Sequence, residues 1–179
     1  LPLEKRDTHR PRMKPTSQYP QAVPNPPKNS LSDDTLVISS EFLQRLAVLT
    51  RKLGYVFNDL SLAKLALTHR SFDSKKNYER LEFLGDALLG MIVGEALYHR
   101  YPTQNEGRLT RMRATLVRQE SLVIIAQNLE LSNQLILGVG ERKGGGRNRA
   151  SILADAVESL IGAIYLDSQD MNITRVCVL

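Results

Sequence analysis

The segment Glu-Arg-Leu-Glu-Phe-Leu-Gly-Asp, residues 79–86, places three carboxylates in a stretch that is otherwise largely apolar. Glu79, Glu82 and Asp86 are spaced at i, i+3 and i+7, so they share one face of an α-helix with about 3.6 residues per turn. Burying several like charges on one face is costly unless a cation compensates them. The spacing therefore predicts a cation site on a buried helix.

A second acidic pair, Asp155 and Glu158, lies three residues apart in the apolar run 151–165. Two such helices packed side by side would form a cluster of oxygen ligands, with no His or Cys at ligand spacing. Oxygen-only sites favour Mg²⁺, or Mn²⁺ as a substitute, over Zn²⁺. Ions held in this way support phosphodiester hydrolysis.

The alternative to a metal site is that the same acids form ion pairs with arginines of this chain. Arg80, Arg111 and Arg113 are the candidates. The residues alone leave both interpretations open, although two acidic clusters on two apolar helices favour the metal.

The composition is that of a basic chain of 179 residues, with 42% hydrophobic residues and a net charge of +5. A basic surface around an acidic pocket suits a polyanionic partner, but the charge alone is equally compatible with an ordinary basic protein. The single cysteine excludes an internal disulfide and a multi-cysteine zinc site. No apolar run of about 18 residues and no secretory signal is found, so we expect a cytoplasmic protein without a membrane partner.

Prolines divide the chain into two parts. Seven of the eight lie between Pro2 and Pro27, where no periodic apolar pattern accompanies them. We therefore predict a disordered, proline-rich extension over residues 1–38 and a folded domain over residues 39–179.

The folded part is predicted to be all-α. Apolar residues recur at helical spacing from Ser40, and Gly54 supplies a left-handed stop. Asn58 and Asp59 can cap a second helix, which would run from Leu60 to about His69. Further predicted elements are a long acidic helix ending before Pro102, helices over 108–119 and 120–129, an exposed glycine-rich loop over 138–149, a helix capped by Ser151, and the start of another helix after Asp170.

The segment Tyr-Glu-Arg-Leu-Glu-Phe-Leu-Gly-Asp-Ala-Leu-Leu, residues 78–89, resembles the signature motif of the ribonuclease III family. Other segments resemble the same family in the same order, and together they cover nearly everything from Ser40 onward. These segments are 67–72, 98–102, 106–107, 111–118 and 149–163. The resemblance implies an all-α endonuclease domain, a helical bundle that forms a homodimer.

The implied activity is Mg²⁺-dependent cleavage of double-stranded RNA, giving 5′-phosphate and 3′-hydroxyl ends with short 3′ overhangs. Precursors of ribosomal RNA and other structured RNAs would be substrates. Carried over by position, Asp86 and Glu158 would be catalytic, and Glu82, Asp155 and Glu158 would bind the metal.

The resemblance also assigns further residues. Glu79 and Glu106 match secondary acids near the cleavage site, and Phe83 matches an aromatic residue that inserts into the partner subunit. Basic residues are the candidates for contacts with RNA phosphates. They are Arg108, Arg118, Arg142, Lys143, Arg147 and Arg149.

The chain departs from a typical bacterial member of this family at its end. We expect the last nuclease helix to be truncated and no double-stranded-RNA-binding domain to follow. The alternative hypothesis is therefore a dimer that binds double-stranded RNA and is catalytically impaired by the truncation.

Overall fold

The computed structural model describes residues 38–179. The predicted extension over residues 1–38 lies, apart from Ile38, outside the described residues. Within the described part, every regular element is helical, and the one β-type contact is an isolated bridge between Thr68 and Ile136. None of the described helices is long and apolar enough to cross a membrane.

The first helix, α1 (Ser40–Leu53), begins and ends as the sequence predicts. At its start, the Ser39 side chain accepts a hydrogen bond of 3.1 Å from the Phe42 N–H. At its end, Gly54 adopts φ 66°, and its N–H donates to the Thr50 carbonyl at 2.9 Å. This left-handed conformation favours glycine, so the predicted stop at Gly54 is confirmed.

The second helix, α2 (Leu60–Ala66), is capped by Asp59, whose carboxylate accepts from the N–H groups of Ser61 and Leu62 at 2.8 and 3.3 Å. It ends before His69, where the prediction placed its end. The reason is a tertiary contact, because the His69 N–H donates to the Ile136 carbonyl at 3.0 Å.

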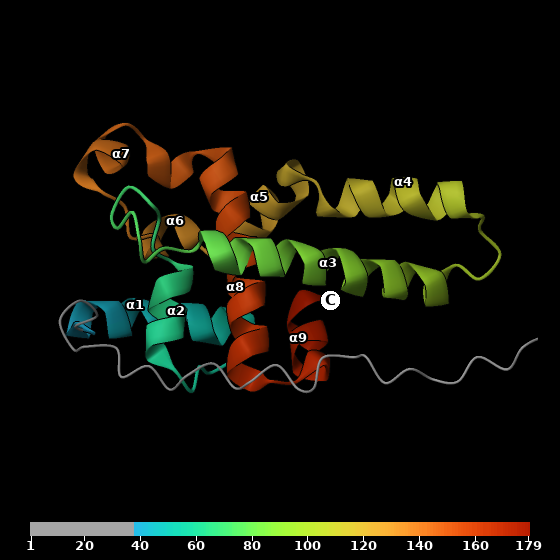
Figure 1. Cartoon of the computed structure of the whole chain (residues 1–179), viewed down its shortest axis with the longest axis horizontal. Helices are drawn as coiled ribbons and strands as arrows, with labels where there is room; N and C mark the ends of the chain where they lie inside the picture. The colour runs from blue at the N-terminus through green and yellow to red at the C-terminus, as the bar shows by residue number, and fades with distance from the viewer. Residues whose placement is uncertain (1–37) are drawn as a thin grey trace, which may run out of the picture. The chain divides into compact units, whose positions relative to one another are not determined.

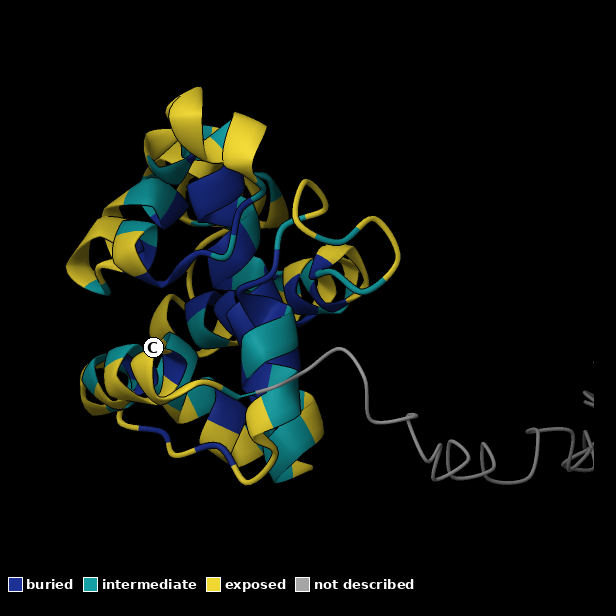
Figure 2. Ribbon diagram, turned by 90° about the vertical axis from the view of Figure 1, so that its left-hand side faces the viewer, coloured by how far each residue is buried: buried dark blue, intermediate teal, exposed yellow. Residues whose placement is uncertain are grey.

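The centre of the fold is the contact between α3 (Glu79–Arg100) and α8 (Ala150–Ser168), which cross in the middle of Figure 1. Two glycines allow the main chains to touch. A Cβ atom at Gly85 would overlap the carbonyl of Glu158, and one at Gly162 would overlap the carbonyl of Leu81. Buried residues gather in the middle of the bundle, as Figure 2 shows.

The remaining long helices surround this pair. α4 (Glu106–Val117) lies along α3 in Figure 1, and α5 (Gln119–Asn128) packs against α8. The short α6 (Leu131–Gln134), which the sequence did not predict, follows α5. α9 (Met171–Val178) begins after its cap Asp170, where the sequence predicts the start of a helix.

The glycine-rich segment 138–149 differs from the prediction of an exposed loop. It forms α7 (Val139–Lys143) and a 3₁₀ turn, η1 (Gly146–Asn148). The segment folds because Glu141 pairs with Arg149 at 2.9 Å and packs so tightly against Gly146 that a Cβ atom there would lie 2.5 Å from its carboxylate.

The predicted cap of the following helix is wrong. Ser151 lies inside α8, whose N-cap position is Arg149 and has no side-chain hydrogen bond. At the other end of α8, the Asp167 carboxylate accepts from the Tyr55 hydroxyl at 2.6 Å and from the Asn58 N–H at 2.8 Å. This end of α8 is thereby tied to the turn between α1 and α2.

Candidate metal centre

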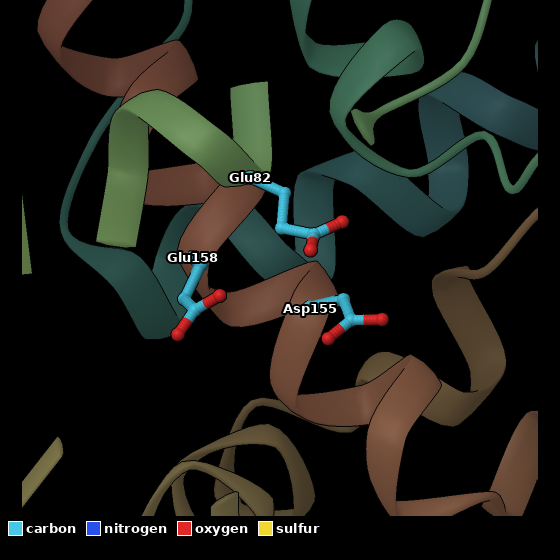
Figure 3. Close-up of side chains that lie close together, drawn as sticks. All are labelled: Glu82, Asp155 and Glu158. Atoms are coloured by element: carbon cyan, nitrogen blue, oxygen red, sulfur yellow. The ribbon is translucent and has the colours of Figure 1, made fainter. Parts of the chain in front are cut away.

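Three carboxylates converge where α3 crosses α8. Glu82 of α3 and Asp155 and Glu158 of α8 each offer an oxygen, and these oxygens all lie within 4.8 Å of one another (Figure 3). All three side chains are half-buried. We call this group the three-carboxylate cluster. The spacing of i and i+3 on α8 places both of its acids toward the same side as Glu82.

Burial and mutual repulsion make the cluster costly without a cation. Burial is the largest cause that raises the pKa of Glu158 to about 7, followed by the charges of Asp86, Asp155 and Glu82. The pKa of Glu82 is also raised, first by burial and then by Asp155. Burial raises the pKa of Asp155 as well, whereas a hydrogen bond from Tyr78 works in the opposite direction.

The alternative prediction, that arginines neutralise these acids, is wrong for the described residues. The ion pairs found there involve none of the three carboxylates and none of Arg80, Arg111 or Arg113. Within residues 38–179, no ion pair therefore neutralises these three acids. A small oxygen-only cluster of this kind fits Mg²⁺ or Mn²⁺.

Asp86 lies outside the three-carboxylate cluster. It is exposed on α3, one turn beyond Glu82, and its charge is the second cause of the raised pKa of Glu158. It therefore lies beside Glu158, on the open side of the site.

The two secondary acids lie apart from the three-carboxylate cluster. Glu79, in the first turn of α3, is 3.3 Å from Arg70 in an ion pair and contributes to the raised pKa of Glu82. Glu106 begins α4 and accepts a hydrogen bond of 2.8 Å from the Thr110 hydroxyl. The structure places Glu79 next to the cluster but does not bring Glu106 to it.

Phe83 is 80% exposed although it is a large apolar residue in the middle of the chain. Its side chain borders a hollow in the surface of the molecule. The apolar residues that line this hollow with Phe83 are Leu62, Leu65, Leu81, Leu84 and Leu166.

The six basic residues predicted to contact RNA have different surroundings. Arg108, Arg142 and Lys143 are exposed, and none of them forms an ion pair with another described residue. Arg118 is 3.7 Å from Glu120, and the Arg149 side chain pairs with Glu141. Arg147 donates to the carbonyl of Ser132 at 2.6 Å.

One residue of the site was missed in the sequence. Tyr78 is only 2% exposed, its ring packs edge-on against His69 at 5.6 Å between centroids, and it hydrogen-bonds with Asp155. Burial is the first cause that raises the pKa of its hydroxyl. A tyrosine before an acidic helix carries no sequence signal for this role, because the contact depends on α8, far along the chain.

Comparison with known proteins places this geometry in a family. Residues 59–178 match a family model described as ribonuclease-III-like. The chain is 99% identical over 167 residues to ribonuclease 3 of Psychrobacter arcticus, and 64% identical over 131 residues to ribonuclease 3 of Acinetobacter pittii. These matches cover 93% and 73% of this chain, but only 63% and 57% of the two relatives' own lengths.

A solved structure gives the same result for the fold. The nuclease domain of ribonuclease III from Campylobacter jejuni, described with a flexible region involved in dimer formation, superposes with a TM-score of 0.72 at 42% identity. The match covers 74% of this chain and 92% of that domain.

Proposed function

This chain belongs to the ribonuclease III family, and we propose on that premise that its folded part is an endoribonuclease domain that hydrolyses double-stranded RNA. The observation that carries the proposal is the three-carboxylate cluster of Glu82, Asp155 and Glu158, with which no arginine among residues 38–179 forms an ion pair. A site that only bound RNA would gain nothing from half-buried negative charge facing phosphates.

Glu82, Asp155 and Glu158 would hold Mg²⁺, or Mn²⁺ in its place, through carboxylate oxygens. The chemistry that a bound divalent ion supplies is Lewis acidity, which lowers the pKa of an attacking water and offsets charge on the leaving oxygen. Tyr78 keeps the Asp155 carboxylate in place from the buried side. Asp86, exposed beside Glu158, can accept a hydrogen bond from the attacking water and orient it.

The products follow from which bond breaks. Water attacks the phosphorus, the bond to the 3′ oxygen breaks, and that oxygen leaves and takes up a proton. The phosphate stays on the 5′ end of one fragment, and the other fragment keeps a 3′-hydroxyl. Precursors of ribosomal RNA and other structured RNAs are the substrates that we propose, and the cytoplasm is the proposed location.

A homodimer would explain cutting of both strands. Phe83, exposed beside a hollow that both leucines and charged residues line, is the contact that we propose between two copies of the chain. A two-fold axis would then repeat the three-carboxylate cluster, one copy for each strand. The distance between the two sites across the minor groove of an A-form duplex would give short 3′ overhangs.

The test is cleavage of a labelled RNA hairpin by the purified chain with Mg²⁺ and with EDTA. We expect metal-dependent cuts, and their loss in Glu158→Gln while RNA binding in Ca²⁺ persists. The exposed Glu41 of α1 supplies a matched control, because Glu41→Gln should cut at the wild-type rate. Intact RNA with wild-type protein and Mg²⁺ would contradict the proposal.

A further inference from the structure

Three arginines that are not part of the proposed metal centre belong to separate elements that pack together. Arg45 belongs to α1, Arg142 to α7 and Arg147 to η1. α6 packs against both α1 and η1, which brings these parts of the chain together. The pKa of Arg147 is lowered first by burial and then by the charges of Arg45 and Arg142, so both of these arginines lie near enough to Arg147 for their charges to act on it.

No acid balances this charge. Among residues 38–179, no carboxylate forms an ion pair with any of the three arginines. Glu141, the acid of the same segment, is engaged with Arg149 at 2.9 Å. Three like charges held together without a counter-charge favour the binding of an anion.

Structural roles use only part of the hydrogen-bonding capacity of these arginines. Arg45 donates to the Asn133 carbonyl at 3.2 Å, and Arg147 donates to the Ser132 carbonyl at 2.6 Å. A guanidinium group has five N–H donors, so most of them are not used by these bonds. The Nε of Arg45 is buried and has no acceptor among residues 38–179.

The arginine cluster is connected directly to the metal-binding helix. Arg147 lies two residues before Arg149, the N-cap of α8, and Asp155 lies five residues after the first residue of that helix, Ala150. Five residues of α-helix span about 7.5 Å. The start of α8, which Arg147 precedes, is therefore within reach of a long polyanion bound at the three-carboxylate cluster, whereas a small substrate would not extend to it.

We propose that Arg45, Arg142 and Arg147 form a phosphate-binding site that holds the backbone of double-stranded RNA beside the three-carboxylate cluster. This inference rests on the proposed function, since it takes duplex RNA as the substrate. Guanidinium groups match phosphate oxygens with paired hydrogen bonds. Contacts of this kind fix the position of the duplex and are independent of its sequence.

The test is equilibrium binding of a labelled RNA hairpin to the full chain in Ca²⁺ over a range of KCl concentrations. Arg142→Ala is the decisive variant, because this exposed side chain makes no hydrogen bond or ion pair with the rest of the described domain. We expect several-fold weaker binding and a plot of log K against log salt that is shallower by about one unit. Replacing all three arginines by alanine should lower the slope further.

Arg51→Ala is the matched control, since Arg51 is an exposed arginine of α1 and lies six residues from Arg45, on another face of the helix. The plot of log K against log salt for Arg51→Ala should have the same slope as the plot for the wild type. Thermal unfolding of each variant separates lost contacts from lost folding. A slope for Arg142→Ala and for the triple variant equal to that of Arg51→Ala would overturn the inference.

The outcomes also separate this inference from the proposed function. A wild-type chain that neither binds nor cuts the hairpin would overturn both. A wild-type chain that binds and cuts, with arginine variants that do the same at every salt concentration, would overturn only the arginine site. Stabilisation by inorganic phosphate that is lost in Arg142→Ala, together with unchanged RNA binding, would identify a free-anion site and overturn the RNA contact.

Discussion

Gly85 of α3 lies directly against the main-chain carbonyl of Glu158 on α8, with no space for a side chain between them. This contact fixes the separation of the two helices at the place where the three carboxylates meet. The separation of Glu82 and Glu158 therefore depends on a contact between the main chains of α3 and α8, and not on flexible side chains.

Gly85→Ala should damage both stability and the metal centre. The added methyl group would overlap the Glu158 carbonyl, so α3 and α8 must move apart. Overpacking of this kind costs about 1–3 kcal/mol or more. We expect lower stability in urea and weaker Mn²⁺ binding.

Gly90→Ala is the control for this variant. Gly90 belongs to the same helix, and a Cβ atom there would meet nothing within 4 Å. Alanine should stabilise the helix there by about 0.5–1 kcal/mol. Equal stability losses in the two variants would show that α3 and α8 do not touch at Gly85.

The stability of the metal-free protein should fall as the pH rises. Glu158 has a pKa of about 7 in the folded protein and an ordinary value of 4.5, so the folded state holds its proton more tightly than the unfolded chain. Its contribution to stability is complete below about pH 4.5 and is lost as the pH rises through about 7. Urea unfolding in EDTA between pH 5 and 8 measures this loss.

Two comparisons assign that pH dependence to the metal centre. Glu158→Gln should flatten the dependence, whereas Glu41→Gln should not change it. Mg²⁺ should stabilise the wild type more at pH 8 than at pH 5.5, because the ion favours the charged carboxylates. Identical pH profiles for the wild type and Glu158→Gln would contradict the raised pKa.

Phe83→Asp should produce monomers. The side chain is 80% exposed in one copy of the chain, and burying an unpaired charge at a contact between two copies is strongly unfavourable. Sedimentation velocity measures the change. Val176→Asp, at a residue of α9 that is 81% exposed, tests whether any new surface charge has this effect, and it should leave a dimer. A dimer of the Phe83→Asp variant would remove this residue from the interface.

Replacing an acidic residue should reduce RNA cleavage more strongly when that residue belongs to the three-carboxylate cluster than when it lies away from it. Glu82→Ala removes a member of the cluster, and we expect cleavage to fall at least a thousandfold, roughly 4 kcal/mol in the barrier. Glu106→Ala removes a carboxylate that contacts Thr110 on α4, and we expect a loss of tenfold or less. Single-turnover cleavage of the hairpin compares them. A larger loss for Glu106→Ala would place this residue at the reacting phosphate of the complex.

Much of the fold could be predicted because its signals are local. Helical periodicity, Gly54 and Asp59 each act within a few residues, and the structure confirms them. The all-helical ribonuclease III fold itself is also confirmed. The segment 138–149 could not be predicted in the same way, because its folding depends on how Glu141 packs against Gly146 and Arg149.

In the candidate metal centre, too, features that depend on local spacing could be predicted, whereas features that depend on contacts between distant residues could not. The spacing of Asp155 and Glu158 on one helix predicted their convergence correctly, because three residues is nearly one turn. Asp86 is on the predicted face of α3, but this face is wider than the part that α8 covers, so the residue stays exposed. The contribution of Tyr78 depends on its burial against α8, which no local pattern reveals.

The contact of α3 with α8 also determines when the centre can form during protein synthesis. Glu82 and Glu158 are 76 residues apart in the sequence, which takes about 4–15 s to translate at about 5–20 residues per second. During that interval a nascent chain carries α3 without the helix that completes the three-carboxylate cluster. The growing polypeptide therefore lacks the proposed cutting centre until nearly all of the domain has been made.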